Sequence, residues 1–477
     1  MSSLRDKTIK GVIWNGVDRF AARGIQFVFG ILIARLLVPE DYGVVAMLNI
    51  FLAVSQSFID SGFGTALVRK IDRTETDFST VFFFNIAVAV IFYLALFVSA
   101  PAIANFYNIP LLESITKVVA LNLIIGSLTG VHNAKLSILI DFKSRAKVSI
   151  ISTLLTGALG LIMAYSGYGV WALVVQSLFS GVIRTIMLWM IVEWHPQLVF
   201  SWKSFKELFS FGSKLLVSGL LDTLYNNVYS LVIGKVFSPS TLGVYSRASG
   251  LAEFPSSNIT AVLQGVTFPV LSSIQNEEDR LVDAYKRLIR ISAFIVFPLM
   301  IGLAAVADPF IHIVLTDKWA GTIPLLQIIC FSMMWYPIHA VNLNILQVKG
   351  RSDYFLKLEV IKKVQGVIIL LVTLPLGIMA MCIGSVVNSI ICLVWNTHYT
   401  KKLMNYGLIN QMKDLFHIIL HSMIMGVIVF IVVCFMHSVW LQLLVGVFAG
   451  MVYYMVGAYI MKFPEMGELL AILKLKR

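Results

Sequence analysis

The stretch ILIARLLVPEDYGV at residues 31–44 aligns without a gap with LVIGKVFSPSTLGV at residues 231–244, an offset of 200 residues. Four aligned positions are identical, including a proline and the glycine four residues after it, and Arg35 matches Lys235 in charge. In both copies the proline ends an apolar, helix-length run. A fainter echo at offset 207 pairs His132 with His339. We interpret these matches as an internal repeat of two six-helix units.

The composition places this repeat in a membrane. Of 477 residues, 58% are hydrophobic and 13% charged, with a mean hydropathy of +0.86. Soluble chains are about 45–50% apolar and about 25% charged. A water-soluble enzyme, a disordered chain and a disulfide scaffold are therefore excluded, and no segment alternates as a membrane β-barrel strand does. The four cysteines form no C-x-x-C pair, so no metal site is expected. The predicted fold class is an all-α polytopic membrane protein.

Apolar runs separated by proline, glycine and charge predict about 14 transmembrane helices. Their ranges are 11–37, 43–67, 79–104, 114–140, 147–165, 169–193, 208–236, 242–272, 287–307, 323–347, 357–374, 377–400, 414–435 and 439–461. The repeat divides them into a six-helix lobe at 1–200, a second at 201–405, and two further helices with a basic tail at 406–477. Six is an even number, so both lobes enter the membrane from the same side and the repeat is parallel.

The distribution of basic residues gives the orientation. One set of alternate connections, including both chain ends, carries 27 lysines and arginines, whereas the other set carries only Lys318. Cytoplasmic connections hold the excess of basic residues in membrane proteins. We therefore expect both termini in the cytoplasm, and we attribute the net charge of +12 to this rule rather than to nucleic-acid binding.

Charged side chains within the first predicted helix indicate a polar pathway. Arg19 and Arg23 are four residues apart and share a face, with Asp18 beside them. Two guanidiniums facing a water-filled cavity suit a diphosphate, which arginine binds with bidentate geometry. The alternative is that both side chains extend to the cytoplasmic surface.

Other polar side chains recur at helical spacing and are candidates for a cavity wall. Phenol and amide groups suit sugar hydroxyls, although hydrogen bonding between helices is the rival interpretation. The candidate set on the helix at 208–236 is Asp222, Tyr225, Asn226 and Tyr229; the set on the helices at 114–140 and 323–347 is His132, Lys135, Trp335, His339 and Asn342. Arg184 is interpreted as the marker of a helix end, and Asp60 lies late in its helix among small residues.

Sequence motifs of enzymes and ATP-driven pumps are missing. The chain has no G-x-x-x-x-G-K-[ST], HExxH or G-x-S-x-G pattern, and its predicted outer connections are too short for a catalytic domain. We therefore expect no enzymatic activity and no cofactor.

Four segments make the chain recognisable: IARLLVPEDYG at 33–43, DSGFGTALVRK at 60–70, LGVYSRASGLA at 242–252 and FPVLS at 268–272. Together they resemble the Wzx-like polysaccharide transporters of the multidrug/oligosaccharidyl-lipid/polysaccharide (MOP) flippase superfamily. The resemblance implies two lobes around a cationic cavity in the bacterial inner membrane. It also implies flipping of undecaprenyl-diphosphate-linked oligosaccharide to the outer leaflet, for lipopolysaccharide, exopolysaccharide or similar surface polymers.

The resemblance also assigns roles. It places Arg19, Arg23 and Arg247 at the diphosphate, and it implies coupling to H⁺ or Na⁺ with Asp18 or Asp222 as carriers. Expected partners are the lipid-linked substrate, membrane lipids, a polysaccharide polymerase and glycosyltransferases. Two alternatives remain open: a cation-coupled multidrug extruder of the sister family, and a non-transporting scaffold for glycan assembly.

Overall fold

The computed structural model describes residues 21–468, and throughout this part the chain is helical, with no strand. The contacts divide it into two compact units that meet at residue 243. The first contains α2 (Arg23–Leu36), α3 (Pro39–Asp60), α4 (Phe63–Arg69), α5 (Glu75–Tyr107), α6 (Leu111–Val119), α7 (Leu121–Ser127), α8 (Gly130–Ile138), α9 (Phe142–Tyr165), α10 (Val170–Ile191) and α11 (Trp202–Val236). This grouping by contact places α11 with the first unit; the repeat-based division at residue 200 stays a prediction.

The second unit begins within α12 (Pro239–Ser273). It continues with α13 (Glu278–Ala305), α14 (Ala307–Val314), α15 (Thr322–Met333), α16 (Tyr336–Val348), α17 (Ser352–Thr373), α18 (Ile378–Met404), α19 (Leu408–Phe435) and α20 (Val439–Ile460). Short 3₁₀ turns lie at Asp317–Trp319 and Leu374–Leu376.

Every predicted helical range overlaps a helix of the structure. Ten helical segments of the described part are long and apolar enough to span a membrane. The chain is therefore a multi-pass helical membrane protein. The predicted ranges that correspond to α2, α11, α12 and α17 fall outside those ten, so the count of fourteen spans stays a prediction.

Three predicted helices are interrupted. The range 43–67 is divided into α3 and α4 because Ser61 and Gly62 adopt positive φ angles of 39° and 68°. A Cβ atom at Gly62 would lie 2.8 Å from the carbonyl oxygen of Gly212, so this glycine also allows α11 to approach closely. The range 114–140 is divided into α6, α7 and α8, and the range 323–347 into α15 and α16. Apolar periodicity continues across such breaks, so the sequence pattern does not predict them.

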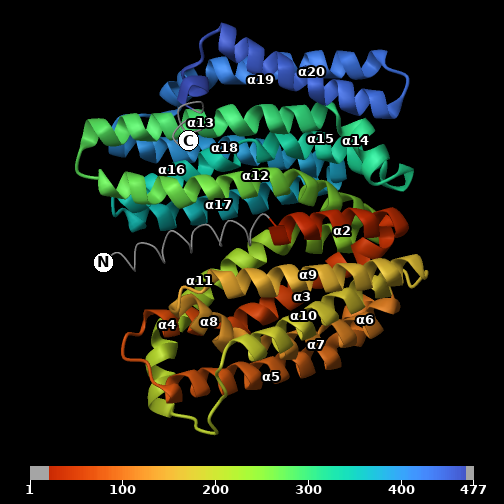
Figure 1. Cartoon of the computed structure of the whole chain (residues 1–477), viewed down its shortest axis with the longest axis vertical. Helices are drawn as coiled ribbons and strands as arrows, with labels where there is room; N and C mark the ends of the chain where they lie inside the picture. The colour runs from red at the N-terminus through yellow and green to blue at the C-terminus, as the bar shows by residue number, and fades with distance from the viewer. Residues whose placement is uncertain (1–20, 469–477) are drawn as a thin grey trace. The chain divides into compact units, whose positions relative to one another are not determined.

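The first unit is built around a long helical hairpin. α9 packs along α10, α2 packs on α9, and α5 packs against α6 and α7, so these helices lie side by side in Figure 1. α9 begins five residues earlier than predicted, because the Asp141 carboxylate accepts a hydrogen bond from the Ser144 amide at 3.0 Å and caps the helix. This earlier start brings Arg145 into the helix.

In the second unit, the two C-terminal helices are bound to the rest of the unit. α19 packs along α13 and forms a hairpin with α20, as Figure 1 shows. The Tyr454 hydroxyl on α20 donates to the carbonyl oxygen of Phe294 on α13 at 2.9 Å. His417 and Arg290 lie at 3.5 and 3.4 Å from the carboxylate of Glu465, beyond α20. α17 pairs with α18, and α18 also packs on α15.

Candidate functional site

Two adjoining cavities lie within the first unit. The α9–α10 cavity has a volume of about 600 Å³ and is lined by α2, α9 and α10, with Tyr42 and Asn133. The second, which we call the Asp60 cavity, has a volume of about 920 Å³ and is lined by α3, α4, α5, α7, α8, α9 and α10. Asn133, Arg145, Ser180 and Arg184 line both cavities. Both volumes fall within the range of about 300–1,000 Å³ that is typical of ligand sites.

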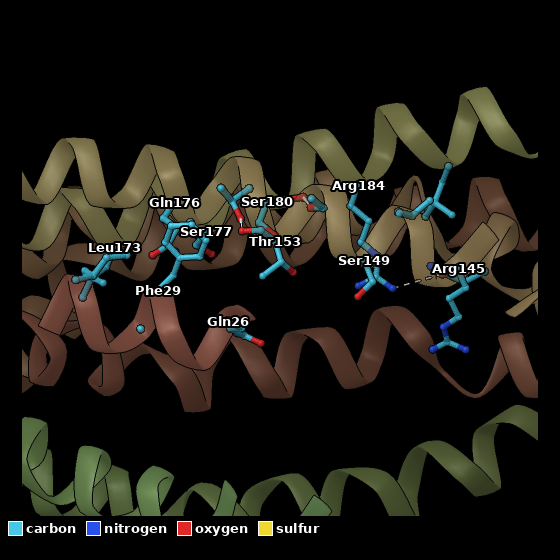
Figure 2. A pocket seen from close by; sticks show the side chains of 18 of the residues that line it. Gln26, Phe29, Arg145, Ser149, Thr153, Leu173, Gln176, Ser177, Ser180 and Arg184 are labelled. Carbon is cyan, nitrogen blue, oxygen red and sulfur yellow. Dashed lines mark hydrogen bonds between the residues drawn. The ribbon is translucent and has the colours of Figure 1, made fainter. Parts of the chain in front are cut away.

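The wall of the α9–α10 cavity is formed by two facing polar stripes. α9 contributes Arg145, Ser149, Ser152, Thr153 and Thr156, and α10 contributes Gln176, Ser177, Ser180 and Arg184. Both sets follow the spacing of three and four residues that places side chains on one helix face. Figure 2 shows Arg145, Ser149 and Arg184 near one end of the cavity and Gln176 and Ser177 towards the other. The cavity therefore has a cationic end and a neutral polar end.

Small residues allow the three helices to approach. A Cβ atom at Gly157 would lie 2.3 Å from the ring of Phe29 on α2, and one at Gly160 would lie 2.8 Å from the side chain of Gln176. Close contact at glycine is a common way in which membrane helices pack. The two glycines of α9 thus bring α2 and α10 to the same cavity.

Several polar groups in this wall are held by neighbours. The Ser152 hydroxyl donates to the carbonyl oxygen of Ser180 at 3.4 Å, across the α9–α10 hairpin. The Asn122 amide on α7 donates to the Ser177 hydroxyl at 2.9 Å. The Arg184 guanidinium donates to the Asn133 side-chain oxygen at 3.4 Å. These bonds fix the positions of the two stripes.

One carboxylate faces the Asp60 cavity. Asp60 ends α3, and its carboxylate accepts a hydrogen bond from the Gln56 amide at 2.9 Å. Among the described residues, the lining of this cavity therefore combines two arginines, one carboxylate and several neutral polar side chains. The described lining of the α9–α10 cavity contains the two arginines and no carboxylate. Arg145, which lines both cavities, offers its cationic side chain to an anionic group at the place where they meet.

The predicted residues of the first helix are only partly described. Asp18 and Arg19 lie outside the described residues. Arg23 begins α2 and is exposed, one turn before Gln26, which lines the α9–α10 cavity. Arg23 itself is not among the described lining residues.

The predicted pair on α8 lies in the packed interior. His132 is fully buried, with its ring stacked on Trp189 at a centroid distance of 4.9 Å and edge-on to Trp194 at 5.3 Å. Lys135 forms an ion pair with Glu75 at 3.1 Å and lies over the Phe78 ring. Both side chains pack against aromatic rings, and neither is among the described lining residues of the two cavities; their place at a cavity wall stays a prediction.

The polar residues predicted to share one face of the helix at 208–236 all lie within α11. Asp222 and Asn226 are exposed, and Tyr225 and Tyr229 are half-buried. α11 packs mainly along α3, where the Thr223 and Ser57 hydroxyls are 3.0 Å apart. The stripe does not contribute to the described lining of either cavity.

The candidates of the second unit belong to separate environments. The Arg247 guanidinium lies 5.6 Å from the centroid of the buried Trp319 ring. Trp335 lies between α15 and α16 and meets the Phe297 ring edge-on. His339 is bonded to Ser389 and Asn396 on α18, each at 3.0 Å.

Asn342 belongs to a buried network of three side chains. It accepts from the Tyr285 hydroxyl and from the Gln411 amide, which also donates to the tyrosine oxygen at 2.8 Å. The three residues join α16, α13 and α19. A fully bonded buried network stabilises packing.

Arg145, Gln176 and the hydroxyls of α9 and α10 are missing from the sequence-based candidates. Two signals could have found them: the Asp141 cap, which extends α9 to include Arg145, and the polar spacing of 176, 177, 180 and 184 on one face of α10. Arg184, interpreted as the marker of a helix end, instead faces both cavities.

Comparisons with known proteins agree with this architecture. Residues 32–324 match the family described as polysaccharide biosynthesis protein. The chain is 26% identical to the teichuronic acid biosynthesis protein TuaB of Bacillus subtilis, over 74% of each chain. It is 22% identical to the lipopolysaccharide biosynthesis protein WzxC of Escherichia coli, over 76% of this chain and 74% of that one.

The fold is also similar to that of a solved transporter. The lipid II flippase MurJ in an inward closed conformation superposes with a TM-score of 0.75, at 14% identity, over 94% of this chain and 98% of that one. At this identity the likeness shows the fold alone. The family match covers more than half of the sequence, and the chain therefore belongs to the polysaccharide biosynthesis protein family.

Proposed function

We propose that this protein flips an undecaprenyl-diphosphate-linked oligosaccharide from the cytoplasmic to the outer leaflet of the bacterial inner membrane. The observation that carries the proposal is the pair of cavities in the first unit, joined at Arg145 and Arg184. A diphosphate–sugar head group cannot cross about 30 Å of hydrocarbon unaided. A polar cavity inside a membrane lobe offers such a head group an environment in which its charge and hydroxyls are bound.

In this proposal the two arginines receive the diphosphate, because guanidinium groups bind phosphate oxygens with bidentate geometry. Arg23, one turn before Gln26 of the cavity wall, acts as an entry for the anion, and we assign the same role to Arg19 from the sequence. Arg247 is the exit contact. The lipid tail stays in the bilayer while the head group passes through the protein, and the lobes open alternately to the two sides.

We also propose that the cycle is coupled to an H⁺ or Na⁺ gradient, with Asp222 or Asp18 as the carrier. Asp222 is exposed on α11, and a carboxylate within a membrane-spanning range is costly unless it meets water or a cation. Asp222→Asn is expected to weaken the dependence of transport on external pH or sodium. A dependence that is identical to that of the wild type would contradict this assignment.

Depletion of the protein in its host tests the proposal. Surface polysaccharide should be lost, lipid-linked glycan should accumulate, and re-expression should reverse both. The alternative of a multidrug extruder predicts unchanged polysaccharide and increased sensitivity to cationic drugs. The arginines at the junction of the cavities favour anionic cargo over such drugs.

A further inference from the structure

From Ser149 beside the arginines to Gln176 at the neutral end, the α9–α10 cavity presents hydroxyl and amide groups that can bind the sugar part of a substrate. We infer that Ser149, Thr153, Gln176 and Gln26 form a specificity subsite for a hydroxyl-rich saccharide attached to the phosphate held at Arg145 and Arg184. This inference rests on the proposed function and adds to it which residues of the first unit distinguish one glycan from another.

The positions of the two stripes define a linear path. The Ser152–Ser180 hydrogen bond and the Gly160–Gln176 contact fix how α9 and α10 align. Ser149 to Gly160 spans 11 residues of α9, which corresponds to about 16 Å at 1.5 Å per residue. Arg145 lies one helical turn before Ser149. A phosphate at the arginines would therefore direct its attached sugars along the hydroxyl and amide groups.

The four subsite side chains are available for bonding. Among the described residues, Ser149, Thr153, Gln176 and Gln26 make no side-chain hydrogen bond, whereas their neighbours Ser152 and Ser177 are bonded to α10 and α7. Polar groups inside a membrane-spanning bundle need a water or ligand partner. The bonded serines hold the wall in place, and the remaining groups present donors and acceptors to the cavity.

The donor set indicates the class of sugar. Amides and hydroxyls both donate and accept, as sugar hydroxyls do. The described lining of this cavity includes two arginines and no carboxylate, so neutral or acidic sugars fit better than sugars that carry a free ammonium group. Phe29 and Leu173 lie at the end opposite the arginines.

A transport assay in proteoliposomes separates this subsite from the general function. The two probes are undecaprenyl diphosphate carrying a single hexose, and the lipid-linked glycan extracted from depleted host cells. The variant Thr153→Val/Gln176→Leu removes a hydroxyl and an amide with little change in volume. The control Thr185→Val removes a hydroxyl of α10 that donates to the carbonyl oxygens of Gly181 and Ile125; Thr185 itself is not among the described lining residues of either cavity.

The double variant should flip the full glycan about tenfold more slowly, as expected for loss of two hydrogen bonds of typical net strength, and should flip the single-hexose lipid at the wild-type rate. The control should flip both probes normally. Equal slowing of both probes, or no slowing of either, would overturn the subsite while leaving the proposed function intact. Failure of the wild-type protein to flip either probe would overturn the proposed function, and the subsite with it.

Discussion

Removing the two arginines where the cavities meet should abolish transport without removing the protein from the membrane. Arg145 is exposed to both cavities, and its side chain makes no hydrogen bond to another described residue. Its loss therefore breaks no side-chain hydrogen bond within the described fold. The Arg145→Ala/Arg184→Ala variant also loses the hydrogen bond from Arg184 to Asn133 at 3.4 Å. Its membrane abundance is therefore measured together with transport, and the expected defect lies in substrate binding.

The size of the defect follows from the chemistry of the contact. A hydrogen bond to a charged group contributes about 1.5–3 kcal/mol, or roughly 10- to 150-fold in affinity for each arginine. Arg145→Lys keeps the charge but not the bidentate geometry, so its affinity for the substrate should fall by about tenfold or less. Arg280→Ala is a matched control, since this arginine is 71% exposed beside Glu277, away from the described cavities.

The assay is complementation of depleted host cells, with surface polysaccharide and membrane abundance measured together. We expect wild-type polysaccharide from the control, reduced polysaccharide from Arg145→Lys, and none from the double alanine variant at normal abundance. Normal polysaccharide from the double variant would refute the assignment of the phosphate to this junction.

Three further predictions concern other parts of the chain. Arg23→Ala should abolish polysaccharide export while leaving membrane insertion intact, as quantified by surface polysaccharide and membrane immunoblots; normal export would remove this helix from the pathway. Gln411→Leu removes the oxygen that accepts a hydrogen bond from the buried Asn342 amide, and it should lower the free energy of unfolding by about 1–3 kcal/mol. The melting temperature in detergent should therefore fall, and an unchanged melting temperature would argue against the network. Burial raises the pKa of Glu465, but a hydrogen bond from His417 and the nearby charge of Arg290 outweigh it, so the pKa lies below its ordinary value. The stabilisation that the Glu465 carboxylate provides is therefore complete above a pH of about 4.5 and is lost as the pH falls through the lowered pKa. The melting temperature of the wild type should therefore fall on acidification, and that of Glu465→Gln should fall less. An equal fall in both proteins would count against this role.

The helical architecture could be predicted from the sequence because it depends on long apolar runs and their breakers. The interruptions could not, since they depend on local backbone conformation. Ser61 and Gly62 divide a continuous apolar pattern by adopting positive φ, and the close approach of Gly212 becomes visible only in three dimensions.

A charged or polar residue within a helix does not by itself identify a cavity wall. The sequence predicts Lys135 and His132 at a cavity wall because polar groups in membranes are costly. In the structure Lys135 is paired with Glu75, and the His132 ring packs against Trp189 and Trp194. Arg145, by contrast, falls between the predicted helical ranges 114–140 and 147–165, whereas α9 begins at Phe142 in the structure. A one-turn error in a helix boundary thus removed a central cation from the candidates.

The most direct test of the central claim is the sidedness of the lipid-linked glycan after depletion. Inverted and right-side-out membrane vesicles would be treated with an added glycosidase, and the remaining lipid-linked glycan measured by mass. The account predicts that the glycan is cleaved in inverted vesicles and protected in right-side-out vesicles, because it accumulates in the cytoplasmic leaflet. Glycan that is cleaved equally in both orientations would show that it crosses the membrane without this protein, and would contradict the account.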